Sequence, residues 1–342
     1  MGLFSCQTLK SHMDLRGLRD YARSLENQLK ERVPHISAEG SEIYSRSVVG
    51  AARPQTESKN FIVERQPLDR WTVSVPHLTV VGERLTFPAE EGSALGQSYF
   101  YYFHPENTHY SKAILWAPGF GVSDFAFFFI KRFFQIELEL GWSVLVWVPP
   151  FHLERQIRGK DAGEGLISPD LNALVADIET SVKELDQAFL WLTQSGYERI
   201  GAWGGSFGAA NLLLLAQNRA FDHLTVMIPL LDWNTLWASS PFMGIQNQFA
   251  SAGIPAERVA SVLASVSPRY GAPPKIQADR IQFLIADYDQ LTPLAVTSEY
   301  LGRLGPPEGP GPQVYRFKES HSTILINSGV YRAYREFLQA MQ

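Results

Sequence analysis

Short apolar segments that alternate with amphipathic helices constrain the fold of this chain more than any other feature. The apolar segments lie at 113–117, 143–148, 199–203, 225–228, 281–286 and 314–317, and two further strands are predicted at 78–87 and 97–103. Between them, the spacing of apolar residues predicts helices at 124–140, 169–194 and 207–218. Continuous apolar strands are typical of parallel sheets, because helices cover such strands on both faces. The sequence therefore predicts an α/β fold with a mostly parallel central sheet.

The composition suits one large core and excludes several classes of protein. Of the 342 residues, 45% are hydrophobic and 19% are charged, which excludes a disordered chain, a collagen-like repeat and a small disulfide-stapled domain. A net charge of -5 provides no electrostatic surface for nucleic acid. The single cysteine, Cys6, cannot form an intrachain disulfide or a multi-cysteine metal site.

Targeting and membrane signals are weak in this sequence. Lys10, Asp14 and Arg16 interrupt the stretch in which the apolar part of an export signal would lie. The richest apolar run, at 125–134, contains two basic residues and is shorter than the ~18 residues of a membrane-spanning helix. We therefore expect a soluble cytoplasmic protein without a transmembrane segment.

The first 70 residues follow a different pattern from the rest. Apolar residues between 9 and 33 recur every three or four positions, which predicts an amphipathic helix docked on the main body. Residues 34–70 are polar, contain prolines and glycine, and show little periodicity, so we interpret them as a loop-rich linker. We expect an amino-terminal extension at 1–70 and a main domain at 71–342.

A G-x-S-x-G motif stands at a predicted strand–helix junction, as Gly204-Gly205-Ser206-Phe207-Gly208. A serine nucleophile has to project from a sharp turn at the carboxyl end of a strand, and glycines on both sides allow the backbone to pack closely. The N–H groups that begin the following helix would face an oxyanion formed at the serine. The motif predicts Ser206 as a nucleophile, and the alternative is a tight turn with an idle serine.

A serine nucleophile needs a histidine base, which follows it in the chain for this type of turn. Two of the eight histidines, His223 and His321, come after Ser206. His223 precedes a strand, whereas His321 follows the last strand, and catalytic groups gather where parallel strands end. We therefore predict His321 as the base.

The acid that orients this histidine has three candidates. Asp289 is preferred because it comes just after the 281–286 strand and before Pro293, which opens the next helix. Asp287 in the same loop and Asp232 after the 225–228 strand remain alternatives. The predicted catalytic residues are Ser206, Asp289 and His321.

With these residues the chain resembles the α/β-hydrolase superfamily over about residues 75–342. The likeness rests on the motif at 204–208, on Asp289 in a form like G-x-x-D-x-x-x-P, and on His321 after the last strand. Within the superfamily the chain is similar to the dienelactone-hydrolase-like group and its uncharacterised abhydrolase-domain relatives. The resemblance implies an eight-stranded sheet with a lid after the sixth strand, and residues 232–275 occupy the position of that lid.

The resemblance also implies that the backbone N–H groups of Phe120 and Phe207 form the oxyanion hole. Pro118-Gly119 stands where the family usually has His-Gly, and Ala286 stands where the acid loop usually has glycine. The change to Pro118-Gly119 does not remove the oxyanion donor, because the donor is the backbone N–H of Phe120 and Pro118 comes before it. The two phenylalanine side chains would border an acyl site or else pack in the core.

A polar loop at 149–165 follows the 143–148 strand and borders the expected site. We interpret His152 and Arg155, with Arg158 beyond them, as contacts to a polar part of the substrate, or else as members of a solvated loop held by its own ion pairs. Ser168 and Asp124 are interpreted as the residues that cap the helices that follow them.

The sequence predicts a serine hydrolase that cleaves a carboxylic ester through an acyl-enzyme. An apolar acyl group would lie near the two phenylalanines and the aromatic lid, with Trp233 and Trp237 as substrate contacts. The alternatives are an amidase or peptidase, an acyltransferase, and a catalytically silent hydrolase fold that binds a partner. The sequence contains no H-E-x-x-H, C-x-x-C, dinucleotide or P-loop motif, so neither a metal nor a cofactor is expected. The oligomeric state is left open.

Overall fold

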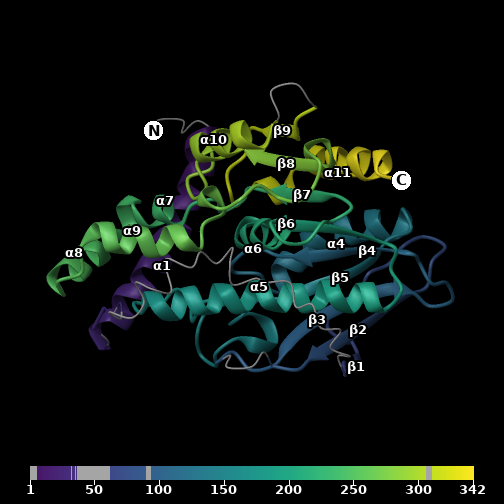
Figure 1. The fold of residues 1–342 in the computed structure, drawn as a ribbon, viewed down its shortest axis with the longest axis horizontal. Helices are drawn as coiled ribbons and strands as arrows, with labels where there is room; N and C mark the ends of the chain where they lie inside the picture. Colours follow the sequence, from purple (N-terminus) through teal and green to yellow (C-terminus); the bar gives the residue numbers. More distant parts are fainter. Residues whose placement is uncertain (1–5, 32, 35, 37–61, 90–93, 306–309) are drawn as a thin grey trace.

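The structure is a computed structural model, and it describes residues 6–31, 33–34, 36, 62–89, 94–305 and 310–342. These residues form a nine-stranded sheet in the order β1-β2-β3-β5-β4-β6-β7-β8-β9 (Figure 1). The strands are β1 (Glu64–Pro67), β2 (Val80–Phe87), β3 (Ser98–Pro105), β4 (Lys112–Ala117), β5 (Ser143–Val148), β6 (Arg199–Gly205), β7 (Leu224–Met227), β8 (Ile281–Ala286) and β9 (Gln313–Phe317). Strands β4 to β9 run parallel, and β1, β2 and β3 are antiparallel to their neighbours.

The predicted α/β fold class is confirmed, with one strand more than the resemblance implies. The additional strand is β1, which pairs with β2 at the edge of the sheet. It lies in the segment interpreted as a linker, and all four of its residues are exposed. An exposed four-residue edge strand has no apolar alternation, and this is why the sequence pattern did not reveal it.

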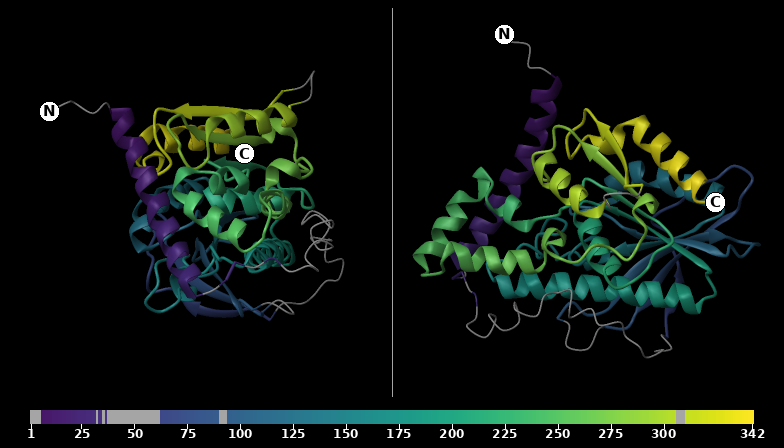
Figure 2. Two further views of the ribbon diagram at one scale, coloured as in Figure 1. Left: turned by 90° about the vertical axis from the view of Figure 1, so that its left-hand side faces the viewer. Right: turned by 45° about the horizontal axis from the view of Figure 1, so that its top comes forward.

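Helices cover both faces of the sheet. Those of the described residues are α1 (Cys6–Glu31), α4 (Asp124–Glu139), α5 (Leu171–Gln194), α6 (Ser206–Ala216), α7 (Trp233–Trp237), α8 (Met243–Ser251), α9 (Ala256–Ser265), α10 (Leu294–Leu304) and α11 (Ser328–Ala340). One apolar core includes Leu185 of α5 and Leu213 of α6, and the other includes Phe133 of α4 and Tyr334 of α11. Figure 2 shows the sheet between α5 and α11.

The segment between β7 and β8 forms a helical insertion that contains α7, α8 and α9. Figure 1 shows these helices grouped at one end of the sheet, and Figure 2 shows α1 running beside them. Leu25 and Leu29 of α1 are buried in the same core cluster as Phe242 and Ile245 of the insertion. The carboxyl-terminal half of α1 therefore packs against the helical insertion.

The first turns of two helices differ from their predicted capping. Asp170, not Ser168, caps α5, and its carboxylate accepts hydrogen bonds from the N–H groups of the next turn. Ser168 instead accepts a hydrogen bond from the N–H of Asp170 at 3.1 Å. A carboxylate also complements the positive end of the helix dipole, which a hydroxyl does not.

Asp124 is the first helical residue of α4, and Ser123 occupies the capping position. The Asp124 carboxylate receives hydrogen bonds from the guanidinium of Arg70 at 2.6 and 2.8 Å and from the indole N–H of Trp71 at 2.9 Å. Because Arg70 and Trp71 come from the segment before β2, Asp124 ties that segment to α4.

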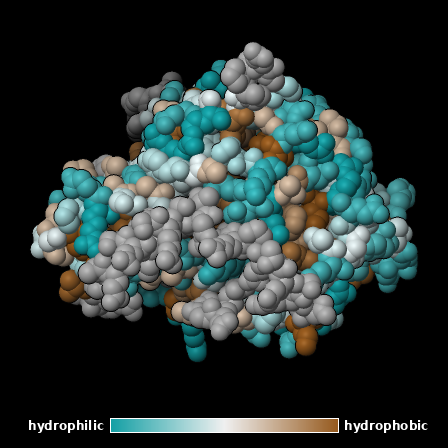
Figure 3. Space-filling model, viewed as in Figure 1, coloured by the Kyte–Doolittle hydropathy of each residue, from teal (hydrophilic) through white to brown (hydrophobic). Residues whose placement is uncertain are grey.

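In the part of the chain that the structure describes, none of the helices has both the length and the apolar character to cross a bilayer. The face shown in Figure 3 is largely hydrophilic, with apolar residues in small groups.

Glu137 places a carboxyl group inside the core under α4. Its side chain is fully buried, and Oε1 accepts hydrogen bonds from the Trp116 indole N–H at 2.8 Å and the Tyr334 hydroxyl at 2.5 Å. Burial raises the pKa of Glu137 to about 8, although these two donors oppose the rise. The folded protein therefore holds this carboxyl group protonated at neutral pH.

Replacement of Glu137 by glutamine is expected to change how stability depends on pH. The carboxyl group has a pKa of 4.5 in the unfolded chain and about 8 in the folded one, so the wild type loses stability as the pH rises between these values. Glutamine does not ionise, so the stability of Glu137→Gln relative to the wild type should increase by about 3 kcal/mol between pH 5 and pH 8. Urea unfolding at both pH values measures this difference. The matched control is Glu139→Gln, an exposed residue of the same helix, and equal behaviour of the two variants would contradict the prediction.

Candidate active site

Ser206 occupies a strained turn between β6 and α6. Its backbone φ is 47°, in the left-handed region that residues other than glycine rarely adopt. A Cβ atom at Gly204 would lie 2.6 Å from the Cα of Ala209, and one at Gly208 would lie 2.0 Å from the carbonyl oxygen of Ala117. Both outer glycines of the motif are therefore needed for this close backbone approach, which holds the serine at the carboxyl end of β6.

The structure brings Ser206, His321 and Asp289 into one hydrogen-bonded series. The Nε2 atom of His321 lies 2.9 Å from the Oγ of Ser206, and its Nδ1 atom lies 2.8 Å from the Oδ2 of Asp289. Ser206 follows β6, Asp289 follows β8 and His321 follows β9. Since these strands are parallel, their carboxyl ends place all three side chains at the same edge of the sheet.

The loop after β8 fixes the carboxylate of Asp289. Its Oδ1 accepts hydrogen bonds from the N–H groups of Leu291 at 2.8 Å and Thr292 at 2.7 Å. Its Oδ2 accepts one from the Thr292 hydroxyl at 2.6 Å besides facing His321. The carboxylate is almost fully buried, so these bonds hold it in a single orientation toward the imidazole.

The surroundings of His321 favour its protonated form. Burial by itself lowers the pKa of the imidazole, but the negative charges of Asp289 and Asp14 outweigh it and raise the pKa above its ordinary value. In the neutral ring, an Nδ1–H that donates to Asp289 leaves Nε2 free to accept the hydroxyl proton of Ser206. This arrangement is suited to moving a proton away from the serine.

The two alternative acids, Asp287 and Asp232, pair with other residues, and the other histidine, His223, lies far from Ser206. Asp287 pairs with Arg316 at 2.8 Å, and Asp232 caps α7 and pairs with Arg269 at 2.7 Å. His223 is fully buried before β7, at the other end of the strands, and burial lowers its pKa. None of these side chains is hydrogen-bonded to Ser206 or His321 in the contacts of the described residues.

The two residues expected to form an oxyanion hole lie on either side of Ser206. Phe207 is in the first turn of α6, where backbone N–H groups have no partner within the helix. The loop that carries Phe120 runs beside the serine, since a Cβ atom at Gly119 would be 3.3 Å from the Cβ of Ser206. Phe120, Ser206 and His321 line a cavity of about 250 Å³. The assignment of the two N–H groups as oxyanion donors stays a prediction.

His152 is hydrogen-bonded to the loop that carries Phe120, the predicted oxyanion donor, which corrects its interpretation as a substrate contact. The side chain is fully buried, its Nδ1–H donates to the carbonyl of Pro150 at 2.7 Å, and its Nε2 accepts from the N–H of Gly121 at 2.8 Å. Burial lowers the pKa of His152 to about 4, so the ring stays neutral and can accept this bond. The ring also packs edge-on against Phe120, with centroids 5.2 Å apart. No ring nitrogen remains for a substrate.

Arg155 forms an ion pair inside the protein, contrary to the expectation that it binds the substrate. Its guanidinium forms two hydrogen bonds of 2.8 Å with the carboxylate of Glu184 on α5. The side chains of Arg155 and Glu184 are only 5% and 2% exposed, so each neutralises a charge that would otherwise be buried unpaired. The sequence could not reveal this pair, because Glu184 appears as an ordinary polar position of a long helix.

The two tryptophans expected to contact the substrate have different environments. Trp233 is 5% exposed and lines an apolar cavity of about 40 Å³, and Ser206 and Phe207 line the same cavity. Trp237 packs against Phe249, with ring centroids 5.2 Å apart, inside the helical insertion. It lines neither this cavity nor the one of about 250 Å³. Of the pair, Trp233 alone therefore lines a cavity together with Ser206.

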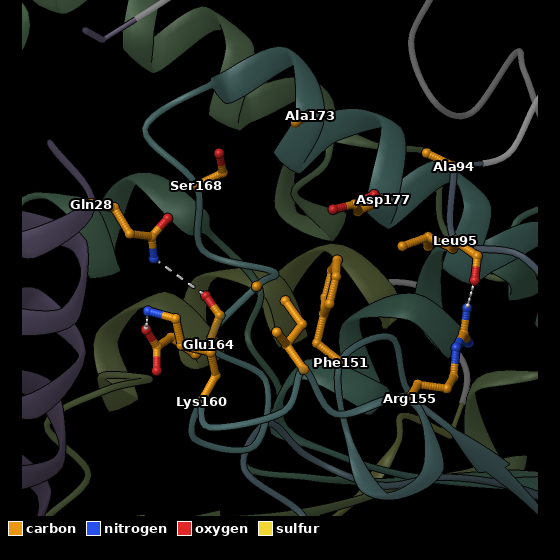
Figure 4. Close-up of a pocket in the computed structure, with 12 residues that line it drawn as sticks. Gln28, Ala94, Leu95, Phe151, Arg155, Lys160, Glu164, Ser168, Ala173 and Asp177 are labelled. Atoms are coloured by element: carbon orange, nitrogen blue, oxygen red, sulfur yellow. Dashed lines mark hydrogen bonds and ion pairs between the residues drawn. The ribbon is translucent and has the colours of Figure 1, made fainter. Parts of the chain in front are cut away.

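Another cavity, of about 530 Å³, lies between the loop at 149–165 and α5 (Figure 4). The Phe151 ring points into it, and Asp177 faces it from α5. Burial raises the pKa of Asp177 to about 7. Ser206 and His321 do not line this cavity. It is separate from the hydrogen-bonded series of Ser206, His321 and Asp289.

Sequence reasoning missed Asp14 of α1, which lines the cavity of about 250 Å³ beside His321. A signal for it exists in the sequence. Asp14 stands 8, 11 and 15 residues before Ala22, Leu25 and Leu29, so it lies on the same helical face as these buried residues. A carboxylate on the apolar face of an amphipathic helix indicates a buried polar contact.

A metal centre was not expected and would need ligands that are grouped in space. Within the described ranges, no three His, Cys, Asp or Glu side chains are placed to hold a metal ion.

Comparisons with known proteins concern the fold. No protein-family model matches the chain, and no curated protein matches it. The chain is similar to the structure of acetyl xylan esterase 1 from Thermoanaerobacterium sp. JW/SL YS485, with a TM-score of 0.52 and 14% identity over 96% of this chain and 98% of that one. It is also similar to Pyrococcus horikoshii acylaminoacyl peptidase, with a TM-score of 0.56 and 17% identity over 77% of this chain and 42% of the peptidase, less than half of its length. Together with the strand order and the turn after β6, these likenesses show that the chain has the α/β-hydrolase fold.

Proposed function

We propose that this protein is a serine hydrolase that cleaves carboxylic esters through an acyl-enzyme. The observation that carries the proposal is the series of two short hydrogen bonds, 2.9 Å from Ser206 to His321 and 2.8 Å from His321 to Asp289. A serine hydroxyl is a weak nucleophile until a positioned base removes its proton, and a base needs a third group to fix its orientation. All three groups meet at the carboxyl edge of the sheet.

The proposed reaction uses each group in turn. The Oγ of Ser206 attacks the carbonyl carbon while His321 Nε2 takes its proton, and the N–H groups of Phe120 and Phe207 stabilise the oxyanion. The bond from carbon to the alcohol oxygen then breaks as His321 returns the proton to that oxygen. Water, deprotonated by the same imidazole, attacks the acyl-enzyme and releases the acid and free Ser206.

The two cavities at Ser206 suggest which end of the ester lies where. His321 lines the cavity of about 250 Å³ but not the one of about 40 Å³. Because His321 has to protonate the leaving alcohol, the alcohol part belongs in the larger cavity. The smaller cavity has an apolar lining that includes Phe207 and Trp233, and its size suits an acyl group of about two to four carbons. The substrate proposed is therefore an ester of a short, apolar acid.

An amide bond is the second candidate, because the same three groups also cleave amides. One of the two fold neighbours is an esterase and the other a peptidase, and this favours neither bond over the other. We favour the ester because its alcohol leaves without the stronger leaving-group activation that an amine needs. A further part of the proposal is that residues 71–342 form the hydrolase domain, with the insertion at 232–275 as its lid and with β1 (Glu64–Pro67) of the preceding segment added at the edge of its sheet.

A covalent probe and a substrate series test this proposal. A fluorophosphonate should form one adduct, and peptide mass spectrometry should place it on Ser206. Among p-nitrophenyl esters, kcat/KM should be highest for acyl chains of about two to four carbons and fall for longer ones, because the small cavity limits the chain. Aminoacyl anilides run beside them separate amidase from esterase activity. If neither the probe nor any substrate reacts, the proposed hydrolase activity is wrong, and a catalytically silent hydrolase fold that binds a partner is favoured instead.

A further inference from the structure

The amino-terminal helix reaches the candidate active site through one buried carboxylate. Asp14 of α1 is 1% exposed and accepts hydrogen bonds from three backbone N–H groups. Its Oδ2 accepts from His321 at 2.9 Å and from Gln290 at 3.3 Å, and its Oδ1 accepts from Ser322 at 3.0 Å. Hydrogen bonds to an ionised acceptor are stronger than those between neutral groups.

These three N–H groups belong to the two loops that carry the base and the acid. His321 and Ser322 lie in the loop after β9, and Gln290 directly follows Asp289 in the loop after β8. One side chain of α1 therefore connects both loops at the point where their catalytic side chains meet. The distance between His321 and Asp289 depends on how these two loops sit relative to each other.

Two more residues on the same turn of α1 contact the same loops. The Lys10 ammonium pairs with Glu319 at 2.6 Å and donates to the carbonyl of Lys318 at 2.8 Å. The Ser11 hydroxyl donates to the carbonyl of Tyr288 at 3.4 Å. The contacts of α1 with both loops are polar and directional, and they fix the relative position of the loops more closely than apolar packing would.

We propose that Asp14 is a positioning residue of the active site, which joins the histidine loop to the acid loop and so completes the catalytic geometry with a helix from outside the hydrolase sheet. This inference rests on the proposed function, because it assigns Asp14 a role in the proton transfer by His321. A catalytic group misplaced by about 1 Å can cost about 100-fold in rate. Loss of the hydrogen bonds from the two loops to Asp14 would therefore lower the rate of catalysis.

Besides holding the two loops together, Asp14 acts on the pKa of His321 through its negative charge. The carboxylates that act on His321 are Asp289 from the loop after β8 and Asp14 from α1, and both raise its pKa against the lowering effect of burial. The nearby Lys10 and Glu319 pair with each other, so their charges largely cancel. Removal of the Asp14 charge therefore lowers the pKa of His321. Because the base works in its neutral form, the acid limb of kcat/KM then moves to lower pH.

Asp14→Asn tests this inference, since asparagine keeps the shape and one acceptor oxygen but loses the charge. We expect kcat/KM for a reactive p-nitrophenyl ester, and the rate of fluorophosphonate labelling, to fall about 10- to 100-fold. The acid limb of the pH profile should shift to lower pH. The matched control is Asp20→Asn on the same helix, an exposed residue that lies 3.7 Å from the guanidinium of Arg23, and it should leave both quantities unchanged.

Other outcomes separate the competing explanations. If the wild type is not labelled at all, the proposed function fails rather than this inference. An Asp14→Asn variant with an unchanged labelling rate and an unchanged acid limb overturns the inference, and so does a slower variant whose acid limb has not moved. If Asp14→Asn does not fold, Asp14→Glu keeps the charge while it displaces the oxygens. It should show a lowered kcat with the wild-type acid limb, and a wild-type kcat would overturn the inference.

Discussion

Replacement of Ser206 by alanine is expected to lower kcat for ester hydrolysis by about a million-fold. The Oγ atom of Ser206 forms the only bond between enzyme and acyl group in the proposed reaction, and alanine has no nucleophilic atom to replace it. The remaining activity would come from substrate binding and from the oxyanion donors, which act on water as the nucleophile. Hydrolysis of a p-nitrophenyl ester measures the effect, and active-site titration of the wild type gives the concentration of working enzyme.

The structure indicates that this variant will fold. Ser206 has a φ of 47°, and alanine carries the same penalty in this region as serine does. The Oγ makes its hydrogen bond to His321 at the surface of a cavity rather than in the packed core. Thermal unfolding should therefore change little. Ser251→Ala on the exposed side of α8 is the matched control, and a Ser206→Ala variant that keeps a tenth of the wild-type kcat would exclude Ser206 as the nucleophile.

The second large effect is expected for Asp289→Asn, which should lower kcat by about 10,000-fold. The carboxylate oxygens accept hydrogen bonds from Leu291, Thr292 and the Nδ1–H of His321. An asparagine that keeps its oxygen on the loop N–H groups turns its NH2 group toward His321. The imidazole then accepts at Nδ1 and carries its proton on Nε2, where it cannot take the proton of Ser206.

Asp287→Asn separates this effect from a general disturbance of the loop. Asp287 lies two residues earlier, and its carboxylate pairs with Arg316 at 2.8 Å near the surface. A pair of this kind contributes about 0–1 kcal/mol to stability, so kcat should stay within about twofold of the wild type. Steady-state kinetics at saturating ester compares the two variants. Should Asp287→Asn lose more activity than Asp289→Asn, the acid of the proposed triad has been assigned to the wrong residue.

The proposed catalytic series could be predicted from the sequence because each of its three residues has a local sequence signature. Ser206 lies in a glycine-flanked turn, His321 follows the last strand, and Asp289 follows an apolar strand and precedes Pro293. Chain order and strand position are enough to bring the three together once the sheet is parallel. The strand pairing of β6 to β9 supplies that condition.

The roles of the residues around the series were harder to predict from the sequence, since these roles depend on partners far away in the chain. Arg155 was expected to bind substrate, but its guanidinium pairs with the carboxylate of Glu184, 29 residues later in the chain. His152 reaches back 31 residues to the N–H of Gly121. A sequence pattern shows that such side chains can form hydrogen bonds, but not which partner is within reach.

The sequence by itself determined the α/β fold class and predicted the position of the serine turn and the chain order of the proposed catalytic residues, because apolar periodicity and backbone conformation are local properties. Tertiary structure alone decided that β1 extends the sheet, that His152 binds the loop that carries Phe120, and that Asp14 joins the loops after β8 and β9. The bond from Asp14 to His321 spans 307 residues of sequence. Contacts of this length arise from the packing of α1 on the finished domain, and only the assembled fold specifies them.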